Sequence, residues 1–276
     1  MKILQVEHVN IKRILAGTIT TTTDLVAVEE PLEIQLVYST DTGRMQKNIA
    51  VTMRTPGNDE ELAAGFLFTE NIIQGKEAIR DIKKIALDEN RVLVTLHENI
   101  IPVLNKAERN FYSTSSCGIC GKASIDAITI SAAYKDDHDS ISVKACLFYD
   151  LQDALRKQQD VFENTGGIHA CALFTLDAGF IMLREDVGRH NALDKVIGAA
   201  LLEGGLPLTK CILLLSGRAS FELLQKAAMA GIKIVVAVGA PSSLAVELAK
   251  EAGITLIGFL RNDRYNIYSG EQRITL

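Results

Sequence analysis

Three apolar segments in the last quarter of the chain constrain its fold more than any other feature. They run over residues 211–215, 232–238 and 255–260, and helical patterns that begin at Ser220 and Ser242 separate them. Continuous apolar strands that alternate with helices are typical of a parallel sheet covered on both faces. We therefore expect an α/β fold in which this half of the chain forms a three-layer domain with a largely parallel sheet.

A hairpin and a further helix precede these segments. The stretch CALFTLDAGFIMLRED reads as two strands that turn near residues 177–179. The stretch HNALDKVIGAALLEGG places apolar residues on one helical face and ends in glycines, which are favoured just past the end of a helix.

The first hundred residues have a different pattern. Residues 32–38 alternate apolar and polar side chains, which indicates a strand with one wetter face. A second alternating segment carries Ile49, Val51 and Met53. A helix should follow with Asp59 as its cap, and RVLVTLHE should form another strand. We expect a smaller N-terminal α+β domain over residues 1–110 and a C-terminal domain over residues 111–276.

The composition of the chain argues against nucleic acids and membranes as binding partners. The chain has 276 residues, 47% of them hydrophobic, and a formal net charge of -5, so it has no general attraction for nucleic acid or for an anionic membrane. Its start lacks an apolar signal segment, and no apolar run approaches the ~20 residues of a membrane span. We expect a cytoplasmic protein in which any anion site is local.

The predicted sheet suggests where that anion site lies. In open parallel sheets, ligands bind beyond the carboxyl ends of the strands. The residues there carry glycines, hydroxyls and arginines, and two of the loops lead into helix N-termini, which suit phosphate. The candidates are Ser216, Gly217, Arg218, Ser242, Arg261 and Arg264. The pattern favours a nucleotide or another phosphate-bearing ligand, although solvated arginines and simple helix caps would give the same sequence.

A fourth connection, REDVGRHNALDK, also enters a helix. It places Asp186, Arg189, His190 and Asn191 close together. Such a set serves either as a hydrogen-bonded scaffold or as part of a site, and the sequence leaves both open.

The five cysteines divide into two groups. Cys146, Cys171 and Cys211 have apolar neighbours and should be buried thiols. Cys117 and Cys120 stand two residues apart in the turn-rich stretch STSSCGICGKAS. This pair is the candidate reactive site.

Three interpretations of the pair remain open from the residues alone. A structural zinc site needs four ligands, but the chain has no second C-x-x-C and its histidines are scattered. A thioredoxin-like dithiol would follow a buried strand, whereas NKAERNFYSTSS is polar. A sulfur-accepting thiolate would gain from glycines, hydroxyls and the nearby Lys122, which would favour ionisation. Spacing alone does not choose among them.

Longer sequence blocks elsewhere in the chain favour one of these interpretations. TSSCGICGKASIDAI, TGGIHACALF, REDVGRHNALDKVIG, LSGRASFELLQKAAMAGI, APSSLAVELAKEAGITLIGFLR and MRTPGNDEELAAGFLFTENII together resemble the FdhD family of sulfur carrier proteins. The blocks occur in the family's order from about residue 26 to the C-terminus, and only the first ~25 residues are unmatched.

The resemblance implies a sulfurtransferase-type carrier. Such a protein accepts sulfur from a cysteine desulfurase as a persulfide on Cys117, with Cys120 assisting. It passes the sulfur to the molybdenum cofactor, a bis(molybdopterin guanine dinucleotide), before the cofactor enters formate dehydrogenase. The cofactor is a client, and no metal is bound directly by the protein.

The resemblance also maps a binding site and a fold. The guanine-dinucleotide site corresponds to Phe259, Leu260, Arg261, Asn262, Asp263 and Arg264. The C-terminal half should be similar to the cytidine deaminase fold without its zinc ligands, and the protein should be a homodimer. Two other functions stay open: a cofactor-binding chaperone without sulfur transfer, and a thiol–disulfide oxidoreductase.

Overall fold

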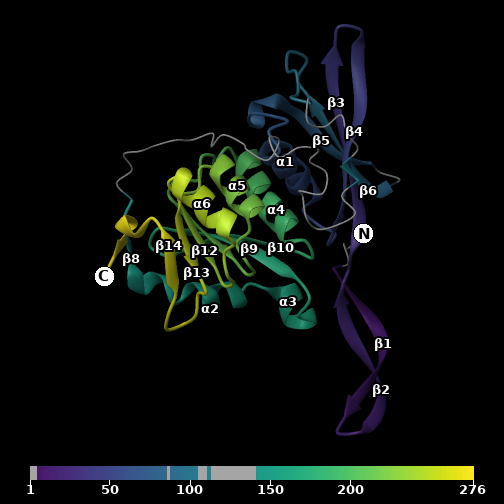
Figure 1. Ribbon diagram of the computed structural model, residues 1–276. Helices are drawn as coiled ribbons and strands as arrows, with labels where there is room; N and C mark the ends of the chain where they lie inside the picture. Colours follow the sequence, from purple (N-terminus) through teal and green to yellow (C-terminus); the bar gives the residue numbers. More distant parts are fainter. Residues whose placement is uncertain (1–4, 86–87, 105–110, 113–140) are drawn as a thin grey trace.

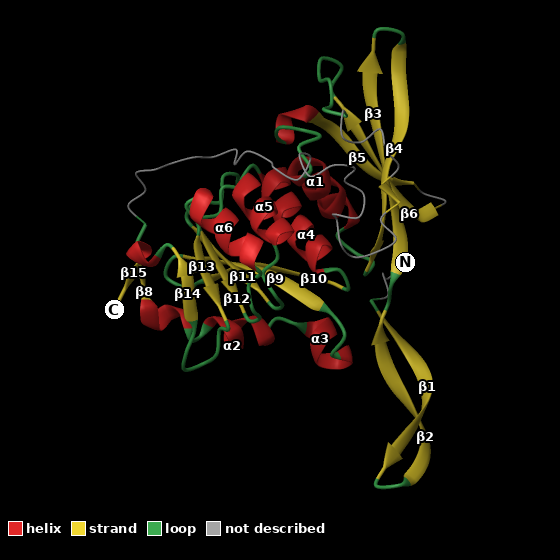
Figure 2. Cartoon of the chain, viewed as in Figure 1, coloured by secondary structure: helices red, strands yellow, loops and turns green. Residues whose placement is uncertain are grey.

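The computed structural model describes residues 5–85, 88–104, 111–112 and 141–276. Two large sheets, two small two-stranded sheets and six α-helices organise these residues. Figure 1 and Figure 2 show their arrangement. None of the helices in these ranges is long and apolar enough to cross a membrane.

The larger sheet has six strands in the order β10-β9-β11-β12-β13-β14. The strands are β9 (His169–Thr175), β10 (Phe180–Asp186), β11 (Cys211–Leu215), β12 (Ile234–Ala237), β13 (Thr255–Gly258) and β14 (Asn266–Ser269). β11, β12 and β13 run parallel, whereas β9, β10 and β14 pair antiparallel with their neighbours. The sheet is therefore mixed with a parallel centre, and not largely parallel as expected, because β9 and β10 are joined by a tight turn that only antiparallel strands allow.

Helices cover both faces of this sheet (Figure 1). On one face lie α4 (Arg189–Glu203), α5 (Phe221–Met229) and α6 (Ser243–Glu251), and on the other lie α2 (Leu151–Arg156) and α3 (Asp160–Thr165). Alternate residues of β11 divide between the two sides: Leu213 belongs to the core shared with α4–α6, and Leu214 to the core shared with α2. Burial on both faces explains the continuous apolar strands.

The N-terminal sheet has five strands in the order β5-β6-β3-β4-β7. The strands are β3 (Glu30–Thr40), β4 (Gly43–Arg54), β5 (Ile79–Ile85), β6 (Asp88–Leu96) and β7 (Phe111–Tyr112). Helix α1 (Asp59–Thr69) packs between this sheet and α4, and one continuous apolar core runs from β3 through α1 and α4 to β11. The two sheets are thus coupled through the α1–α4 contact.

Short elements complete the described chain. The 3-10 helices are η1 (Lys76–Ala78), η4 (Ala145–Phe148) and η5 (Glu271–Arg273), and β8 (Val143–Lys144) pairs in parallel with β15 (Ile274–Thr275).

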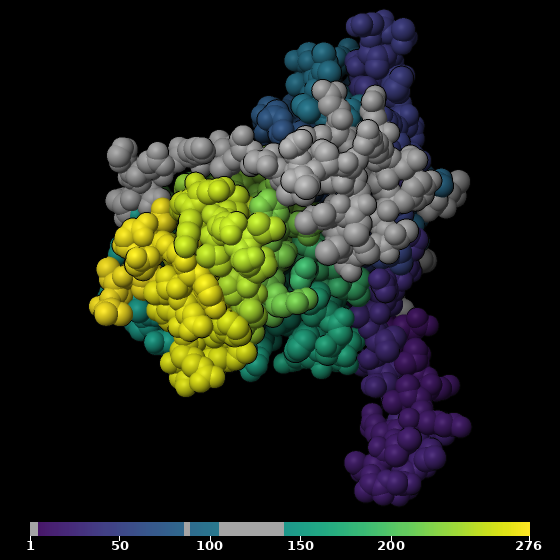
Figure 3. Space-filling model, in the orientation of Figure 1, coloured from purple at the N-terminus to yellow at the C-terminus, as the bar shows by residue number. Residues whose placement is uncertain are grey.

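An arm projects from the body. It is the hairpin of β1 (Val6–Leu15) and β2 (Thr18–Ala27), paired antiparallel along its whole length. The threonine-rich segment forms β2, so it is an extended strand. None of the arm residues, all of which the structure describes, is buried. Figure 3 shows the tip of the arm standing clear of the body, whereas both strands also contact α3.

Two local predictions need correction. β4 contains a bulge at Ile49, where the partner of Ile34 is Ala50 and that of Gln35 is Asn48. The bulge reverses the alternation, so Ile49 and Ala50 are both buried whereas Met53 is 42% exposed.

The second correction concerns the start of α1. Asp59 is its first residue rather than its cap, which is Asn58 in a left-handed conformation. The Asp59 carboxylate binds Arg54 and Lys84 instead, at 3.0 and 2.9 Å.

Candidate functional site

The carboxyl ends of the parallel strands bring the predicted binding loops together. Residues 216–218 follow β11, residues 238–242 follow β12, and residues 259–264 follow β13. Backbone hydrogen bonds join the three: the amide of Gly239 donates to the carbonyl of Gly217 at 2.9 Å, and that of Phe259 donates to the carbonyl of Gly239 at 3.1 Å. We call this part of the sheet the carboxyl edge.

The antiparallel strands add two more segments to the carboxyl edge. β9 begins at His169 beside the end of β11, and β10 ends at Asp186, which pairs with His169. The connection from β10 into α4, with Arg189 at the helix start, therefore lies at the same edge. The N-termini of α4, α5 and α6 all begin there, so their free N–H groups favour negative charge.

The two serines that precede α5 and α6 differ in their contacts. The Ser242 hydroxyl accepts a hydrogen bond from the amide of Ala245 at 3.3 Å and caps α6. Ser220 precedes α5, but its side chain makes no capping bond within the described structure. The hydroxyl of Ser216, a third candidate, accepts a bond from the amide of Ala170 at 2.9 Å and ties β11 to β9.

Close backbone packing shapes the edge. A Cβ atom at Gly239 would lie 2.9 Å from the backbone nitrogen of Arg218, so a glycine is needed where the two loops cross. Phe259 has a φ of 55° and is 43% exposed. An aromatic residue in the left-handed region is strained, and such strain concentrates at ligand-binding positions.

The predicted arginines differ in their contacts. One terminal guanidinium nitrogen of Arg261 donates to the carbonyls of Val238 and Leu260, at 2.9 and 2.6 Å, so Arg261 braces the 259–264 loop. Its backbone amide donates to the carbonyl of Arg264 at 2.8 Å, which closes a turn. Arg218 and Arg264 are both exposed at the carboxyl edge.

The other members of the 259–264 loop contact the body differently. Leu260 is fully buried, and Asp263 is exposed. The side-chain amide nitrogen of Asn262 donates to the carboxylate of Asp153 on α2 at 3.1 Å. This hydrogen bond connects the loop to α2.

A pocket of about 480 Å³ opens beside these loops. We call it the α2–α3 pocket because α2 and α3 form one side of it and the ends of β11 and β12 form the other. Its lining includes Arg156, Phe162, His169, Ser216, Gly217 and Val238. Two of the predicted residues, Ser216 and Gly217, thus belong both to the carboxyl edge and to this pocket.

Two arginines at the edge lie close enough to His169 to affect its pKa. Burial lowers the pKa of His169, and the nearby charges of Arg189 and Arg218 lower it further, against the opposing effect of Asp186. Burial is the largest cause of this lowering, and the two guanidinium groups act in the same direction. An anionic ligand would find favourable charge here.

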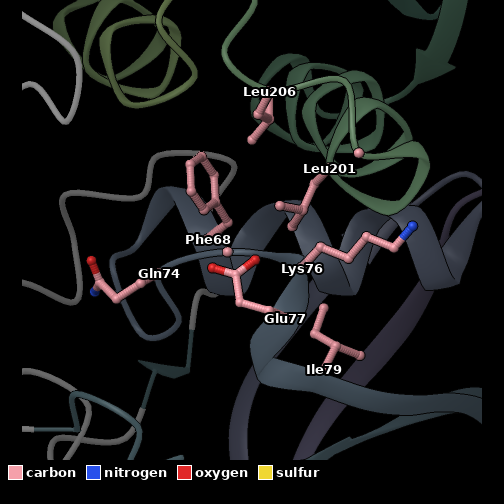
Figure 4. Close-up of a pocket in the computed structure, with 9 residues that line it drawn as sticks. Phe68, Gln74, Lys76, Glu77, Ile79, Leu201 and Leu206 are labelled. Carbon is pink, nitrogen blue, oxygen red and sulfur yellow. The ribbon is translucent and has the colours of Figure 1, made fainter.

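A second pocket, of about 520 Å³, lies elsewhere (Figure 4). Phe68 of α1 and Leu201 near the end of α4 line it, together with Lys76 and Glu77. Because α4 has 15 residues, this pocket is roughly 20 Å from the carboxyl edge at the other end of that helix. Its lysine stands beside a glutamate, so it lacks the excess of positive charge at the edge.

Most polar side chains in the connection from β10 into α4 have a structural role. Asp186 and Lys195 form a buried ion pair at 2.7 Å. Lys195 also donates to the carbonyl of Thr55 at 2.8 Å, and the Asn191 amide donates to the carbonyl of Met53 at 2.7 Å. These side chains fasten α4 to the end of β4.

The three cysteines within the described residues do not share one environment. Cys171 is buried and Cys211 is half-buried, and burial raises the pKa of both thiols. Cys146 is exposed, so the expectation of a buried thiol is wrong there, because it lies in the short surface helix η4. The candidate reactive pair, Cys117 and Cys120, lies outside the described residues.

Sequence reasoning did not identify Arg156 and His169 as part of the site. Arg156 lies on a short helix without a motif, and nothing local relates it to the ends of β11 and β12. His169 belongs to the TGGIHACALF block, which contributes to the family resemblance. That block could have pointed to His169, but no function was assigned to its residues.

Comparisons with known proteins identify one family. The sequence model of the FdhD/NarQ family matches residues 27–275. The sulfur carrier protein FdhD of Streptomyces avermitilis is 48% identical over 278 residues, covering 98% of this chain and 96% of its own. The protein of the same name from Sulfolobus acidocaldarius is 40% identical and covers 99% of this chain and 100% of its own.

A solved structure gives the same result for the fold. The crystal structure of a formate dehydrogenase accessory protein from Desulfotalea psychrophila matches with a TM-score of 0.76 and 27% identity. The match covers 99% of this chain and 100% of the other. The mixed α/β architecture with parallel strands is therefore shared with that protein.

Proposed function

The chain belongs to the FdhD/NarQ family, and from that membership we propose that it is a sulfur carrier that serves formate dehydrogenase. Sulfur is taken from a cysteine desulfurase as a persulfide on Cys117 and is delivered to the molybdenum cofactor, the bis(molybdopterin guanine dinucleotide), before that cofactor enters the enzyme. The cofactor is the substrate of this delivery.

The first step is a thiol exchange. The Cys117 thiolate attacks the outer sulfur of the desulfurase persulfide, the sulfur–sulfur bond breaks, and the desulfurase thiolate leaves. One sulfur atom moves and no electron is gained or lost overall. Lys122 and the hydroxyl neighbours favour the ionised thiol that this attack needs.

The second step needs two electrons, because persulfide sulfur is released as sulfide only on reduction. We assign these electrons to Cys120, whose thiolate attacks the inner sulfur on Cys117. A Cys117–Cys120 disulfide forms and the outer sulfur leaves as hydrosulfide to the client. A cellular thiol then reduces the disulfide for the next cycle.

The observation that carries the proposal is the convergence of loops at the carboxyl edge. Three helix N-termini and the exposed Arg218 and Arg264 meet there beside the α2–α3 pocket. Diphosphates suit such an arrangement, because N–H groups and guanidinium groups donate hydrogen bonds to phosphate oxygens. We place the nucleotide portion of the client at Ser216, Gly217, Arg218, Ser242 and residues 259–264.

Family membership also suggests the oligomeric state, the cellular compartment and the fold type. We propose that the protein works as a homodimer in the cytoplasm and that the larger sheet with its helices is a variant of the cytidine deaminase fold. The order of its layers, with helices on both faces of a mixed sheet, supports this.

Sulfur loading tests the proposal. The purified chain is incubated with a cysteine desulfurase and cysteine, and its intact mass is measured. We expect a gain of one sulfur atom, located by peptide mapping at Cys117, and no gain in Cys117→Ala. Cys146→Ala is the matched control, because Cys146 is an exposed thiol outside the pair, and it should load normally.

Two results would reject the assignment. One is loading of Cys117→Ala at the wild-type level. The other is GDP binding without any cyanide-releasable sulfur on the wild-type chain, which would indicate a cofactor-binding chaperone instead.

A further inference from the structure

The α2–α3 pocket has a composition suited to a flat aromatic ligand. Leu155 and Ile168 are buried in its wall, and Val238 is half-buried there. Phe162 lines it and is 39% exposed, so part of its ring is available for contact. Aromatic rings stack on nucleic acid bases because every base presents a π-face.

Two glycines keep one side of the pocket open. Gly166 ends α3 in a left-handed conformation with a φ of 65°. A Cβ atom at Gly166 would have no neighbour within 4 Å among the described residues, and one at Gly167 would meet only the carbonyl of Thr165 at 3.8 Å. These glycines belong to the TGGIH motif, to which the sulfur-transfer chemistry assigns no role.

Arg156 adds hydrogen-bond donors to the pocket. With the Gln152 amide oriented to satisfy both of its neighbours, its oxygen accepts from a terminal guanidinium nitrogen of Arg156 at 3.2 Å. Its nitrogen donates to the carbonyl of Leu260, also at 3.2 Å. The Arg156 side chain is thereby tied to the 259–264 loop. Its other guanidinium N–H groups have no hydrogen-bond partner among the residues that the structure describes.

From these contacts we propose that the α2–α3 pocket holds the purine base of the client nucleotide and that Arg156 selects guanine over adenine. A guanidinium only donates, and guanine presents two adjacent acceptors, O6 and N7. Adenine presents an amino group in place of O6, which would leave an Arg156 donor facing another donor. Phe162 stacks on either base and gives affinity without selecting.

This inference rests on the proposed function for the identity of the client. The residues that it assigns to the base pocket are not among those that the proposed function uses. Arg156, Phe162 and the two glycines lie outside the 259–264 loop and the strand ends. The Gln152 bridge and the Asn262–Asp153 hydrogen bond at 3.1 Å make α2 the link between the base pocket and that loop. Base and phosphates of one nucleotide would then lie on the two sides of this link.

Calorimetric titration with GDP, ADP and inorganic pyrophosphate tests the proposal on the full chain. We expect the wild-type chain to bind GDP more tightly than ADP. Arg156→Gln should lower GDP affinity by about tenfold to a hundredfold, which is the usual value of a bidentate arginine–guanine pair. It should leave ADP and pyrophosphate affinities nearly unchanged.

The matched control is Lys157→Gln, which removes the same charge one residue further along, at a position that does not line the pocket. It should bind all three ligands as the wild-type chain does. Phe162→Ala should weaken GDP and ADP equally, by about tenfold or more, because base stacking is insensitive to the base. Thermal unfolding of each variant shows whether it is folded.

Three outcomes would overturn the inference: equal wild-type affinity for GDP and ADP, an Arg156→Gln effect no larger than that of Lys157→Gln, or equal loss of pyrophosphate and GDP binding in Arg156→Gln. The last would make Arg156 a phosphate ligand. Each of these leaves sulfur loading on Cys117 intact. Failure of the proposed function is seen separately, as loss of loading with base selectivity retained.

Discussion

Gly65 of α1 and Gly198 of α4 face each other where the two helices cross. A Cβ atom built at Gly65 would overlap the carbonyl oxygen of Asp194, and one built at Gly198 would overlap the carbonyl oxygen of Glu61. The two backbones therefore touch without intervening side chains. This contact joins the N-terminal sheet to the larger sheet and so holds the carboxyl edge in place.

Gly198→Ala should destabilise the protein by about 3 kcal/mol or more, because neither backbone can move without separating the two sheets. Thermal or urea unfolding measures the change. Gly167→Ala is the control, since the nearest atom to its added Cβ lies 3.8 Å away. Equal stability of the two variants would show that the helices separate easily.

Asp59→Asn should lower the free energy of unfolding by about 3–5 kcal/mol at neutral pH, because it leaves the buried Arg54 without its main partner. Burial raises the pKa of Asp59, but the hydrogen bonds and charges of Arg54 and Lys84 outweigh it, so the net shift is downward. A lowered pKa stabilises the fold above the unfolded value of about 4, and this stabilisation is lost as pH falls.

Urea unfolding at neutral pH and near pH 3 checks the prediction for Asp59. The gap between wild type and Asp59→Asn should narrow in acid. Glu33→Gln is the control, because the Glu33–Arg91 pair at 2.7 Å is partly exposed and should contribute less than about 1 kcal/mol at either pH. A gap that is unchanged in acid would contradict the ionised pairing.

Arg189→Gln should raise the pKa of His169, because the Arg189 charge is the largest electrostatic contribution to its lowering after burial. Pyrophosphate should raise it in the wild-type chain for the same reason, since an anion offsets the guanidinium charges. NMR titration of the imidazole protons measures both effects. Arg91→Gln, a change on the N-terminal sheet, should have no influence, and a response to it would place the effect outside the carboxyl edge.

Deletion of residues 1–27 should change the free energy of unfolding by less than about 1 kcal/mol. The arm has no buried residue along its described length, and segments with few buried contacts contribute little to global stability. Ile14, Leu15 and Ile19 at its tip are 69%, 76% and 63% exposed. Thermal unfolding tests this, and a loss of more than about 5 °C would show that the arm supports the body.

Local pattern was enough to place most elements of the larger sheet. The apolar run 211–215 is β11, and the two following runs contain β12 and β13, which are shorter than predicted by three and two residues. The glycines after α4 end it in the predicted way, with Gly204 in a left-handed conformation. These features depend on the period of apolar residues and on backbone preferences, which a short segment already carries.

Predictions from the sequence pattern were wrong for the burial or the role of several individual residues. The bulge at Ile49 turned Met53 outward, and Asp59 left its expected capping role for Arg54. Cys146 is exposed although its neighbours are apolar. In each case the neighbours in space, and not those in sequence, determine the environment.

The sequence by itself determined most element types, the order of the strands and helices after residue 169 and, through its long motifs, the family. Only the tertiary structure decided that Asp186 and Lys195 serve as scaffold and that Arg156 faces the ends of β11 and β12. The physical reason is that a buried charge is stable only with a partner, and Lys195 finds part of its partnership at Thr55, 140 residues away. Contacts of that kind leave no periodic trace along the chain.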